Sequence, residues 1–261
     1  MKRLKRLSHP EQDAQLRARF LRGARLQLAL HHEALLGACD LISDEGQLAL
    51  VMPYCEGGNL RMRLRNGPLP WREALSLGRH LLGGLQLLHT RGIVHRDIKP
   101  ENLLFLSTSD PLSAVRLGDF GIARSIETQA SLTVPMTELG SLAYLSPSRA
   151  EGCDATPADD LYSLSLVLYE SILGSFPFRQ QGDFGHFQRL YERAALPPLE
   201  SFGHPRALSL FFERALSTQS CDRPPTLQSY AWALDQLIST PSLLHPEFWT
   251  DKCYDQWSPE R

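Results

Sequence analysis

One short stretch of the sequence limits what this chain can fold into more than its length does. Residues 95–102 read HRDIKPEN, and residues 119–121 read DFG. Between them, the apolar runs 103–106 and 115–117 have the pattern of two short strands joined by the polar loop 107–114. Paired as a hairpin, these strands would carry both motifs at one end. The fold must therefore hold several charged and amide side chains together on a rigid support.

Neither motif is specific alone, because DFG is an ordinary turn sequence and HRD is an ordinary run of surface charge. Together, in this order and around a hairpin, they resemble the signature of the protein kinases, with Ile98 where leucine is commoner. The resemblance extends from Leu4 to about Leu237. It implies an α+β, protein-kinase-like fold with a mainly helical C-lobe and a truncated small β-sheet N-lobe.

The resemblance also implies a reaction, the transfer of the γ-phosphate of ATP to a hydroxyl group, which depends on positioning and charge stabilisation. Asp97 would accept or orient the proton of the acceptor hydroxyl, and Lys99 would lie against the moving phosphate. Asn102 and Asp119 would hold Mg²⁺ through hard oxygen ligands. These four are the predicted catalytic residues, and ATP and Mg²⁺ are the predicted cofactors.

Two features predict the class of substrate. A lysine two residues after Asp97, followed by Glu101, resembles the serine/threonine kinases of bacterial type rather than the tyrosine kinases. Small-molecule kinases share the Asp-then-Asn arrangement, but they lack the segment 140–147 together with the anchors Asp160 and Arg223. Protein substrates are therefore expected.

The beginning of the chain departs from the family. The family has a G-x-G-x-x-G-x-V phosphate loop ahead of a V-A-I-K-like strand, and these residues show no such loop. Lys5 best matches the strand lysine, although residues 2–6 also fit a solvated basic terminus. In the predicted helix 11–30, Gly23 stands where the family has the glutamate that pairs with this lysine. We therefore expect the ion pair to be missing and nucleotide placement to be weakened.

Gln27 is a second departure in the same helix. It takes the place of an apolar residue that, in the family, stacks toward Phe120 and His95. The resemblance therefore predicts that this hydrophobic column is interrupted.

Two further strands, 35–43 and 47–54, are predicted across a turn, and the second ends in the hinge. Besides Lys5, the resemblance assigns five residues to the nucleotide: Met52 as gatekeeper, the carbonyl of Pro53, the amide of Cys55, Asn59 at the ribose and Leu104 beneath the base. Core packing is the alternative for Met52 and Leu104, and an inert buried thiol is the alternative for Cys55.

The segment 119–149 resembles an activation segment. Phosphorylation of Thr133 or Thr137 would order it against Arg96, whereas solvation alone also explains its hydroxyl groups. Ser148 stands where the family has a glutamate that pairs with Arg223. The buried arginine would then need another acceptor, such as Glu151, or access to water.

Asp160 begins a very apolar helix that runs to residue 172, and by resemblance it anchors the backbone of the catalytic loop. A favourable charge at a helix N-terminus is the simpler explanation. Other helices are predicted at 71–90, 183–195, 205–217 and 225–238. The expected organisation is a partial N-lobe (1–54), a hinge with the helical C-lobe (55–240) and a tail (241–261).

Composition excludes some alternatives. The net charge of −2 gives no basic footprint for nucleic acid, and no run of about 18 apolar residues predicts a transmembrane segment. Five scattered cysteines and the lack of a signal-peptide pattern predict reduced thiols and a cytoplasmic location. Composition does not predict the oligomeric state.

Two functional hypotheses follow from these features. The first is an active serine/threonine kinase, in which the lost glutamate is compensated and upstream strands are missing through a late start. The second is a catalytically impaired pseudokinase or truncated kinase that acts as a binding scaffold. The set Asp97, Lys99, Asn102 and Asp119 favours the first, and the missing phosphate loop with Gly23 favours the second.

Overall fold

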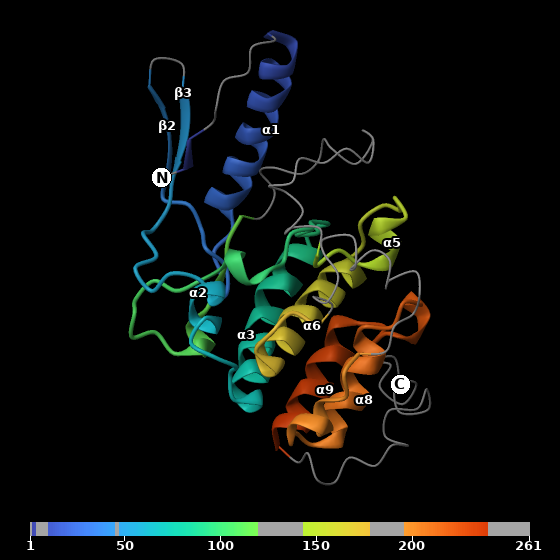
Figure 1. Cartoon of the computed structure of the whole chain (residues 1–261). Helices are drawn as coiled ribbons and strands as arrows, with labels where there is room; N and C mark the ends of the chain where they lie inside the picture. Colours follow the sequence, from blue (N-terminus) through green and yellow to red (C-terminus); the bar gives the residue numbers. More distant parts are fainter. Residues whose placement is uncertain (1, 4–9, 45–46, 120–142, 178–195, 240–261) are drawn as a thin grey trace.

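The computed structural model describes residues 2–3, 10–44, 47–119, 143–177 and 196–239 (Figure 1). Helix α1 (Pro10–Ala29) and a small antiparallel sheet form one end of the molecule. The sheet has the strand order β1 (Lys2–Arg3), β3 (Gln47–Val51), β2 (Asp40–Asp44). The register pairs Leu50 of the central strand with Lys2 on one side and Leu41 on the other.

The helical part lies below the sheet in Figure 1. Its described α-helices are α2 (Leu60–Leu64), α3 (Trp71–His89), α5 (Pro147–Ala150), α6 (Pro157–Leu173), α8 (Arg206–Ala215) and α9 (Leu227–Ser239). Short 3₁₀ turns span Pro100–Asn102, Leu112–Ala114, Leu199–Phe202 and Ser220–Asp222. This confirms the predicted α+β architecture with a mainly helical larger lobe.

Helix α6 is the central element of the helical part, because nearly all of its residues are buried. It begins with a capping box between Thr156 and Asp159 and ends at Gly174, whose φ of 81° closes the helix in the left-handed conformation. Gly78 of α3 lets the two helices approach closely, since a Cβ at this position would lie 2.5 Å from a methyl carbon of Leu168. The close packing of α3 on α6 fixes the base on which the catalytic loop rests.

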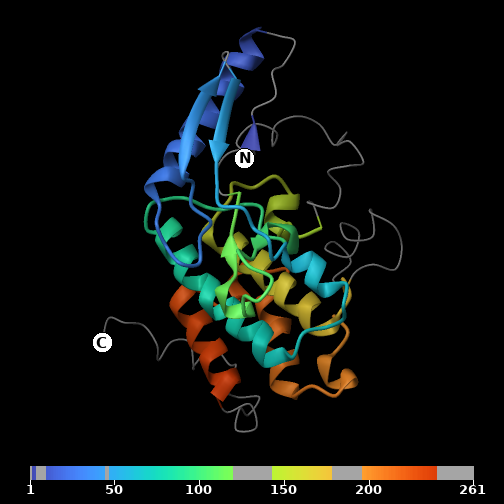
Figure 2. The same ribbon diagram turned by 90° about the vertical axis from the view of Figure 1, so that its left-hand side faces the viewer.

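A two-stranded hairpin of β4 (Leu103–Leu104) and β5 (Arg116–Leu117) lies against α3 (Figure 2). The ring of His80 on α3 bonds the carbonyl of Val115 at 3.0 Å. The hairpin predicted between the two sequence motifs is therefore confirmed, with shorter strands than 103–106 and 115–117.

Several predicted boundaries differ from the structure. The strand 35–43 is wrong for residues 35–39, because Leu35 forms an isolated bridge with Leu117 and the strand starts only at Asp40. The strand 47–54 ends at Val51, where the chain leaves the sheet for the hinge. The predicted helix 183–195 lies outside the described residues. Helices 11–30, 71–90, 205–217 and 225–238 are confirmed to within two residues at each end.

Candidate active site

The loop between α3 and β4 brings three predicted catalytic side chains together. The Nζ atom of Lys99 lies 3.0 Å from Oδ2 of Asp97. The amide nitrogen of Asn102 donates to the same oxygen at 3.0 Å and to the backbone carbonyl of Asp97 at 2.7 Å. Two donors thus fix the orientation of a carboxylate whose side chain is 18% exposed.

The fourth predicted catalytic residue, Asp119, follows β5 and has an exposed side chain. The preceding residue, Gly118, donates its backbone N–H to the carbonyl of Asn102 at 2.8 Å. Asp119 has a φ of 60°, in the left-handed region that few residues other than glycine adopt. The hairpin thus brings the residue that precedes Asp119 into contact with Asn102.

Asp160 of α6 supports the catalytic loop from below. Its carboxylate accepts the backbone N–H groups of His95 at 2.8 Å and Arg96 at 2.9 Å, and it bonds Nε2 of His89 at 2.8 Å. Arg96 has a φ of 70°, so these contacts hold a strained backbone conformation just before Asp97. The predicted anchoring role of Asp160 is confirmed. Asp159, rather than Asp160, forms the capping box.

His95 is the buried link between the loop and the hairpin. Its Nε2 contacts the carbonyl of Gly118 at 2.9 Å, and its Nδ1 accepts the N–H of Asp97 at 3.3 Å. Burial lowers the pKa of the imidazole, although Asp160 and the Gly118 carbonyl oppose this. The ring is therefore neutral and carries its proton on Nε2.

Beside the catalytic loop, the guanidinium of Arg61 forms a cluster of contacts that the sequence does not predict. Nε of Arg61, on α2, lies 2.8 Å from Glu101, and its Nη1 lies 2.5 Å from Glu170. Its Nη2 also donates to the hydroxyl of Tyr144, which in turn donates to Glu170. No local signal predicts this contact, because Arg61 is separated from Glu101 by 40 positions and from Glu170 by 109.

The predicted hinge residues lie between the end of β3 and the start of α2. Met52 packs against the hydrophobic cluster of the sheet lobe, and Pro53 is exposed. Cys55 is half-buried, and burial raises the pKa of its thiol. Asn59 forms an isolated bridge with Leu104 and accepts the N–H of Met62 at 2.9 Å as the N-cap of α2.

Helix α1 lacks the acidic residue expected of the family. Gly23 is buried and has no side chain to offer, and Lys5 lies outside the described residues. Gln27 is completely buried, and among the described residues neither atom of its side-chain amide has a hydrogen-bond partner. Phe120, Thr133 and Thr137 also lie outside the described residues.

Arg223, which was expected to lack its glutamate partner, contacts backbone carbonyls and an aromatic ring. Arg223 is 5% exposed; its Nε donates to the carbonyl of Ser217 at 2.8 Å, and its guanidinium lies 4.8 Å from the ring centre of Tyr162. Burial lowers its pKa, against the opposing effects of Tyr162 and Asp159. Among the described residues, Glu151 does not accept from Arg223, and Nη1 of the guanidinium stays buried without a hydrogen-bond partner. The Ser148 hydroxyl donates to Asp159 at 2.9 Å instead.

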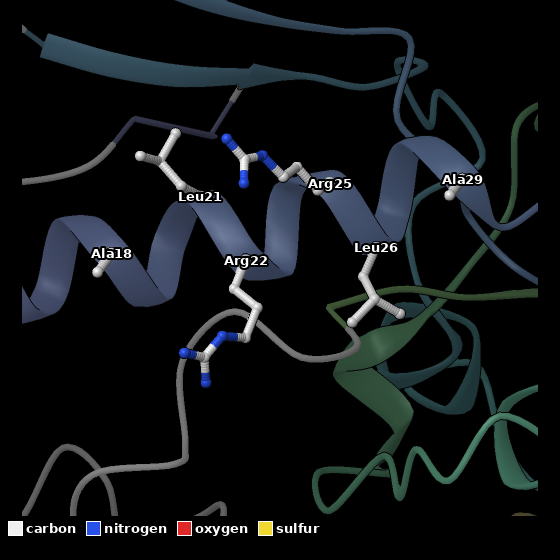
Figure 3. A pocket seen from close by; sticks show the side chains of 6 residues that line it. All are labelled: Ala18, Leu21, Arg22, Arg25, Leu26 and Ala29. Atoms are coloured by element: carbon white, nitrogen blue, oxygen red, sulfur yellow. The ribbon is translucent and has the colours of Figure 1, made fainter.

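A separate hollow of about 570 Å³ lies along α1 (Figure 3). Its described lining comprises Ala18, Leu21, Arg22, Arg25, Leu26 and Ala29. None of the predicted catalytic or nucleotide-binding residues is among these, so the candidate active site remains the catalytic loop and the hinge.

Curated proteins with similar sequences are named as serine/threonine-protein kinases. The chain is 39% identical over 167 residues to serine/threonine-protein kinase PknL of Mycobacterium tuberculosis, covering 64% of this chain and 41% of the relative. It is 41% identical over 162 residues to serine/threonine-protein kinase pkn2 of Myxococcus xanthus, covering 61% of this chain and 19% of the relative. The chain thus spans less than half the length of these relatives.

Solved structures and a family comparison agree with the fold. The kinase domain of Mycobacterium tuberculosis PknI superimposes with a TM-score of 0.62 at 26% identity, covering 86% of this chain and 80% of that one. In the part of the chain that the structure describes, no helix is long and apolar enough to cross a membrane. The model of the protein kinase domain matches residues 1–226, and the chain therefore belongs to the protein kinase family.

Proposed function

We propose that this chain is a serine/threonine protein kinase that transfers the γ-phosphate of ATP to hydroxyl groups of proteins. The observation that carries the proposal is the Asp97 carboxylate, fixed by Lys99 and Asn102 on a loop that Asp160 anchors. The relatives named above, which are serine/threonine-protein kinases, support the same reaction.

Asp97 would orient the acceptor hydroxyl and receive its proton. Its Oδ2 already has two donors, Lys99 and Asn102, so the carboxylate is held in one orientation before any substrate arrives. Lys99 carries a positive charge to this position, where it would face the phosphoryl group during transfer. A pre-oriented base and a nearby cation are what in-line phosphoryl transfer needs from the protein.

Asn102 and Asp119 fit a magnesium site by their chemistry. The amide nitrogen of Asn102 points to Asp97, which leaves the amide oxygen to serve a cation. Asp119 adds a carboxylate, and Mg²⁺ is usually held by one or two such oxygen donors together with phosphate oxygens. When bound, Mg²⁺ neutralises charge on the phosphates.

The nucleotide would lie between the hinge and the hairpin. We propose that the carbonyl of Pro53 and the amide of Cys55 meet the adenine edge, with Met52 as gatekeeper and Leu104 beneath the base. The bridge between Asn59 and Leu104 supports this, because it joins the hinge side to the hairpin side. Since the side-chain oxygen of Asn59 caps α2, its amide nitrogen is the atom left for a ribose.

Mg²⁺-dependent transfer of phosphate to a protein acceptor tests this function directly. Asp97→Asn should lower the rate by about 10²–10⁴-fold while leaving ATP binding in place. Asp119→Asn should lower both the transfer and the Mg²⁺ dependence of ATP binding. Equal phosphate incorporation by the three proteins would remove the catalytic assignment.

A binding scaffold is the second candidate, and Gly23 favours it. A buried glycine at this place in α1 cannot pair with a lysine that positions the phosphates. A scaffold would bind its protein partner equally well as wild type and as Asp97→Asn, without transferring phosphate. Measuring transfer and partner binding on the same two proteins separates the two functions.

We also propose a reducing, cytoplasmic location for the chain. Four described cysteines, Cys39, Cys55, Cys153 and Cys221, are free thiols. Fractionation of cells that produce the natural full-length protein, with thiol labelling before lysis, would test the compartment. Labelling by a membrane-impermeant reagent in intact cells would contradict it.

A further inference from the structure

The guanidinium of Arg61 makes contacts to three separate parts of the helical lobe. It reaches Glu101 in the catalytic loop, Glu170 near the end of α6 and Tyr144 ahead of α5. Arg61 itself lies in the first turn of α2, two residues after the cap residue Asn59. One side chain on α2 therefore joins the hinge region to the catalytic loop and to residues 143–147 ahead of α5.

The geometry of the cluster makes these contacts strong. Nε of Arg61 lies 2.8 Å from a carboxylate oxygen of Glu101, and Nη1 lies 2.5 Å from one of Glu170. The guanidinium fork can serve several acceptors at fixed angles, which an ammonium group cannot. The side chain of Glu170 is only 4% exposed, so its carboxylate has little access to water. Removing Arg61 would leave this buried carboxylate without its cation.

The pKa shifts of Tyr144 and Arg61 both favour the protonated forms that donate these hydrogen bonds. Burial and the neighbouring Glu170 raise the pKa of Tyr144 well above its usual range, so its hydroxyl stays neutral and can donate. Burial opposes the charge on Arg61, but its hydrogen bonds to Glu170 and Glu101 outweigh this and raise its pKa. The cluster therefore contains one cation, Arg61, and two carboxylates, Glu101 and Glu170.

The contact to Glu101 connects the Arg61 cluster to the predicted catalytic residues. Glu101 immediately precedes Asn102, whose amide holds Asp97. Tyr144 is tied to α6 a second time, because the hydroxyl of Ser163 donates to its backbone carbonyl at 2.8 Å. Displacing the guanidinium would remove its contact to the loop at Glu101 and one of the contacts that hold Tyr144.

We infer that Arg61 is a positioning residue, which holds the catalytic loop and the segment 143–147 in the arrangement that phosphate transfer requires. It acts through Glu101 and Tyr144. This inference rests on the proposed kinase function for its kinetic part only. Its structural part concerns the order of the two segments and can be measured without any activity.

The kinetic test compares wild type with Arg61→Ala and Arg61→Lys. Arg61→Ala should lower kcat for phosphate transfer at least about tenfold and change the KM for ATP by less than about twofold. Ethylguanidine at millimolar concentration should restore part of the lost rate in Arg61→Ala, and ethylamine should not. Arg61→Lys keeps the charge beside Glu170 but loses the fork, so it should lose about three- to tenfold.

Hydrogen exchange provides the structural test on the same proteins. Backbone amides of residues 97–104 and 143–150 should exchange faster in Arg61→Ala, and ethylguanidine should slow them again. Arg79→Ala is the matched control: Arg79 pairs with Asp235 at 2.9 Å on the exposed surface of α3, so its loss should change neither rate nor exchange.

Three results would overturn the inference: full transfer activity of Arg61→Lys, unchanged exchange of both segments in Arg61→Ala, or equal rescue by ethylamine. If wild type transfers no phosphate, the proposed function fails, and the exchange measurement alone still decides the role of Arg61. Arg61→Lys covers the case in which Arg61→Ala does not fold.

Discussion

Gln27 occupies a position in α1 where its polarity costs stability. The side chain is completely buried, and neither its amide nitrogen nor its amide oxygen forms a hydrogen bond within the part of the chain that the structure describes. It lies one turn from Ala24 on one side and from Leu30 on the other, which belong to two different hydrophobic clusters. Burying an unpaired amide costs about 1–3 kcal/mol relative to a satisfied or apolar group.

Gln27→Leu should therefore raise the free energy of unfolding by about 1–2 kcal/mol, because leucine fills a similar volume without a polar group. Urea unfolding followed by circular dichroism measures this. Gln86→Leu is the matched control, since Gln86 is exposed on α3 and its replacement should stay within about 0.5 kcal/mol of wild type. A destabilised Gln27→Leu would mean that the amide has a partner in solution.

His95 should make the stability depend on pH in one direction. Burial lowers the pKa of its imidazole below the value of about 6.5 that the unfolded chain has. The unfolded state then binds more protons as the pH falls below about 6.5, so acidification favours unfolding. The stabilisation is fully present above that pH and declines below it.

Unfolding free energies at pH 7.5 and pH 5.5 test this on wild type and His95→Gln. Wild type should lose up to about 1.4 kcal/mol per pH unit more than the variant, which has no titrating group at this position. His80, whose pKa burial also lowers, contributes equally to both proteins. Parallel pH profiles for the two proteins would contradict a neutral, buried imidazole.

At the scale of elements, the hinge and the hairpin depend on one glycine. Gly57 donates its N–H to the carbonyl of Phe105 at 3.1 Å, and Gly58 accepts from the N–H of Phe105 at 3.0 Å. A Cβ on Gly57 would lie 2.1 Å from the carbonyl oxygen of Ser107. This neighbour is backbone, so it cannot move aside as a flexible side chain can.

Gly57→Ala should therefore destabilise the fold by about 3 kcal/mol, through overpacking where the hinge meets the hairpin. The midpoint of urea unfolding measures the effect. Gly37→Ala is a suitable control, because a Cβ there would meet its nearest atom, the carbonyl oxygen of Leu30, at 3.5 Å, an ordinary contact distance. Equal midpoints for Gly57→Ala and wild type would show that the backbone at Gly57 and Ser107 can move apart to make room for a Cβ.

Local patterns predicted some elements well and failed at others for a physical reason. Helix α3 matches its prediction because an apolar stripe at helical spacing is buried along its whole length and Gly92 follows its end. Residues 35–39 have a strand-like pattern, but Leu36 donates to Leu117 of the distant hairpin. Their conformation is set by a tertiary contact, which a local pattern does not contain.

The residues of the candidate site also fall into those that the sequence predicted and those that only tertiary packing brings together. Asp97, Lys99 and Asn102 lie within one motif, so their proximity follows from the sequence once the family is recognised. The Asp160 anchor followed from the resemblance as well. Arg61 and Glu170 could not be predicted, because their contact depends on how α2 packs against α6.

At the scale of the whole molecule, the described residues form two hydrophobic clusters of very different size. The cluster of the sheet lobe has four buried members: Phe20, Ala24, Leu48 and Leu50. The cluster of the helical lobe extends from the end of α1 through α3, α6 and α8 to α9. Since apolar burial supplies most of the stabilisation, the two lobes should differ in stability.

Native-state hydrogen exchange should therefore show the sheet lobe opening before the rest of the chain. Backbone amides of β2 and β3 and of α1 up to Ala24 should exchange through a local opening, whose free energy lies below that of global unfolding. Amides of α3 and α6 should exchange only through global unfolding, because those helices are buried in the large cluster. Adding Gln27→Leu should raise the opening free energy of α1 by joining the two clusters across an apolar side chain. Equal exchange free energies in β3 and α6 would instead show that the lobes unfold as one cooperative unit.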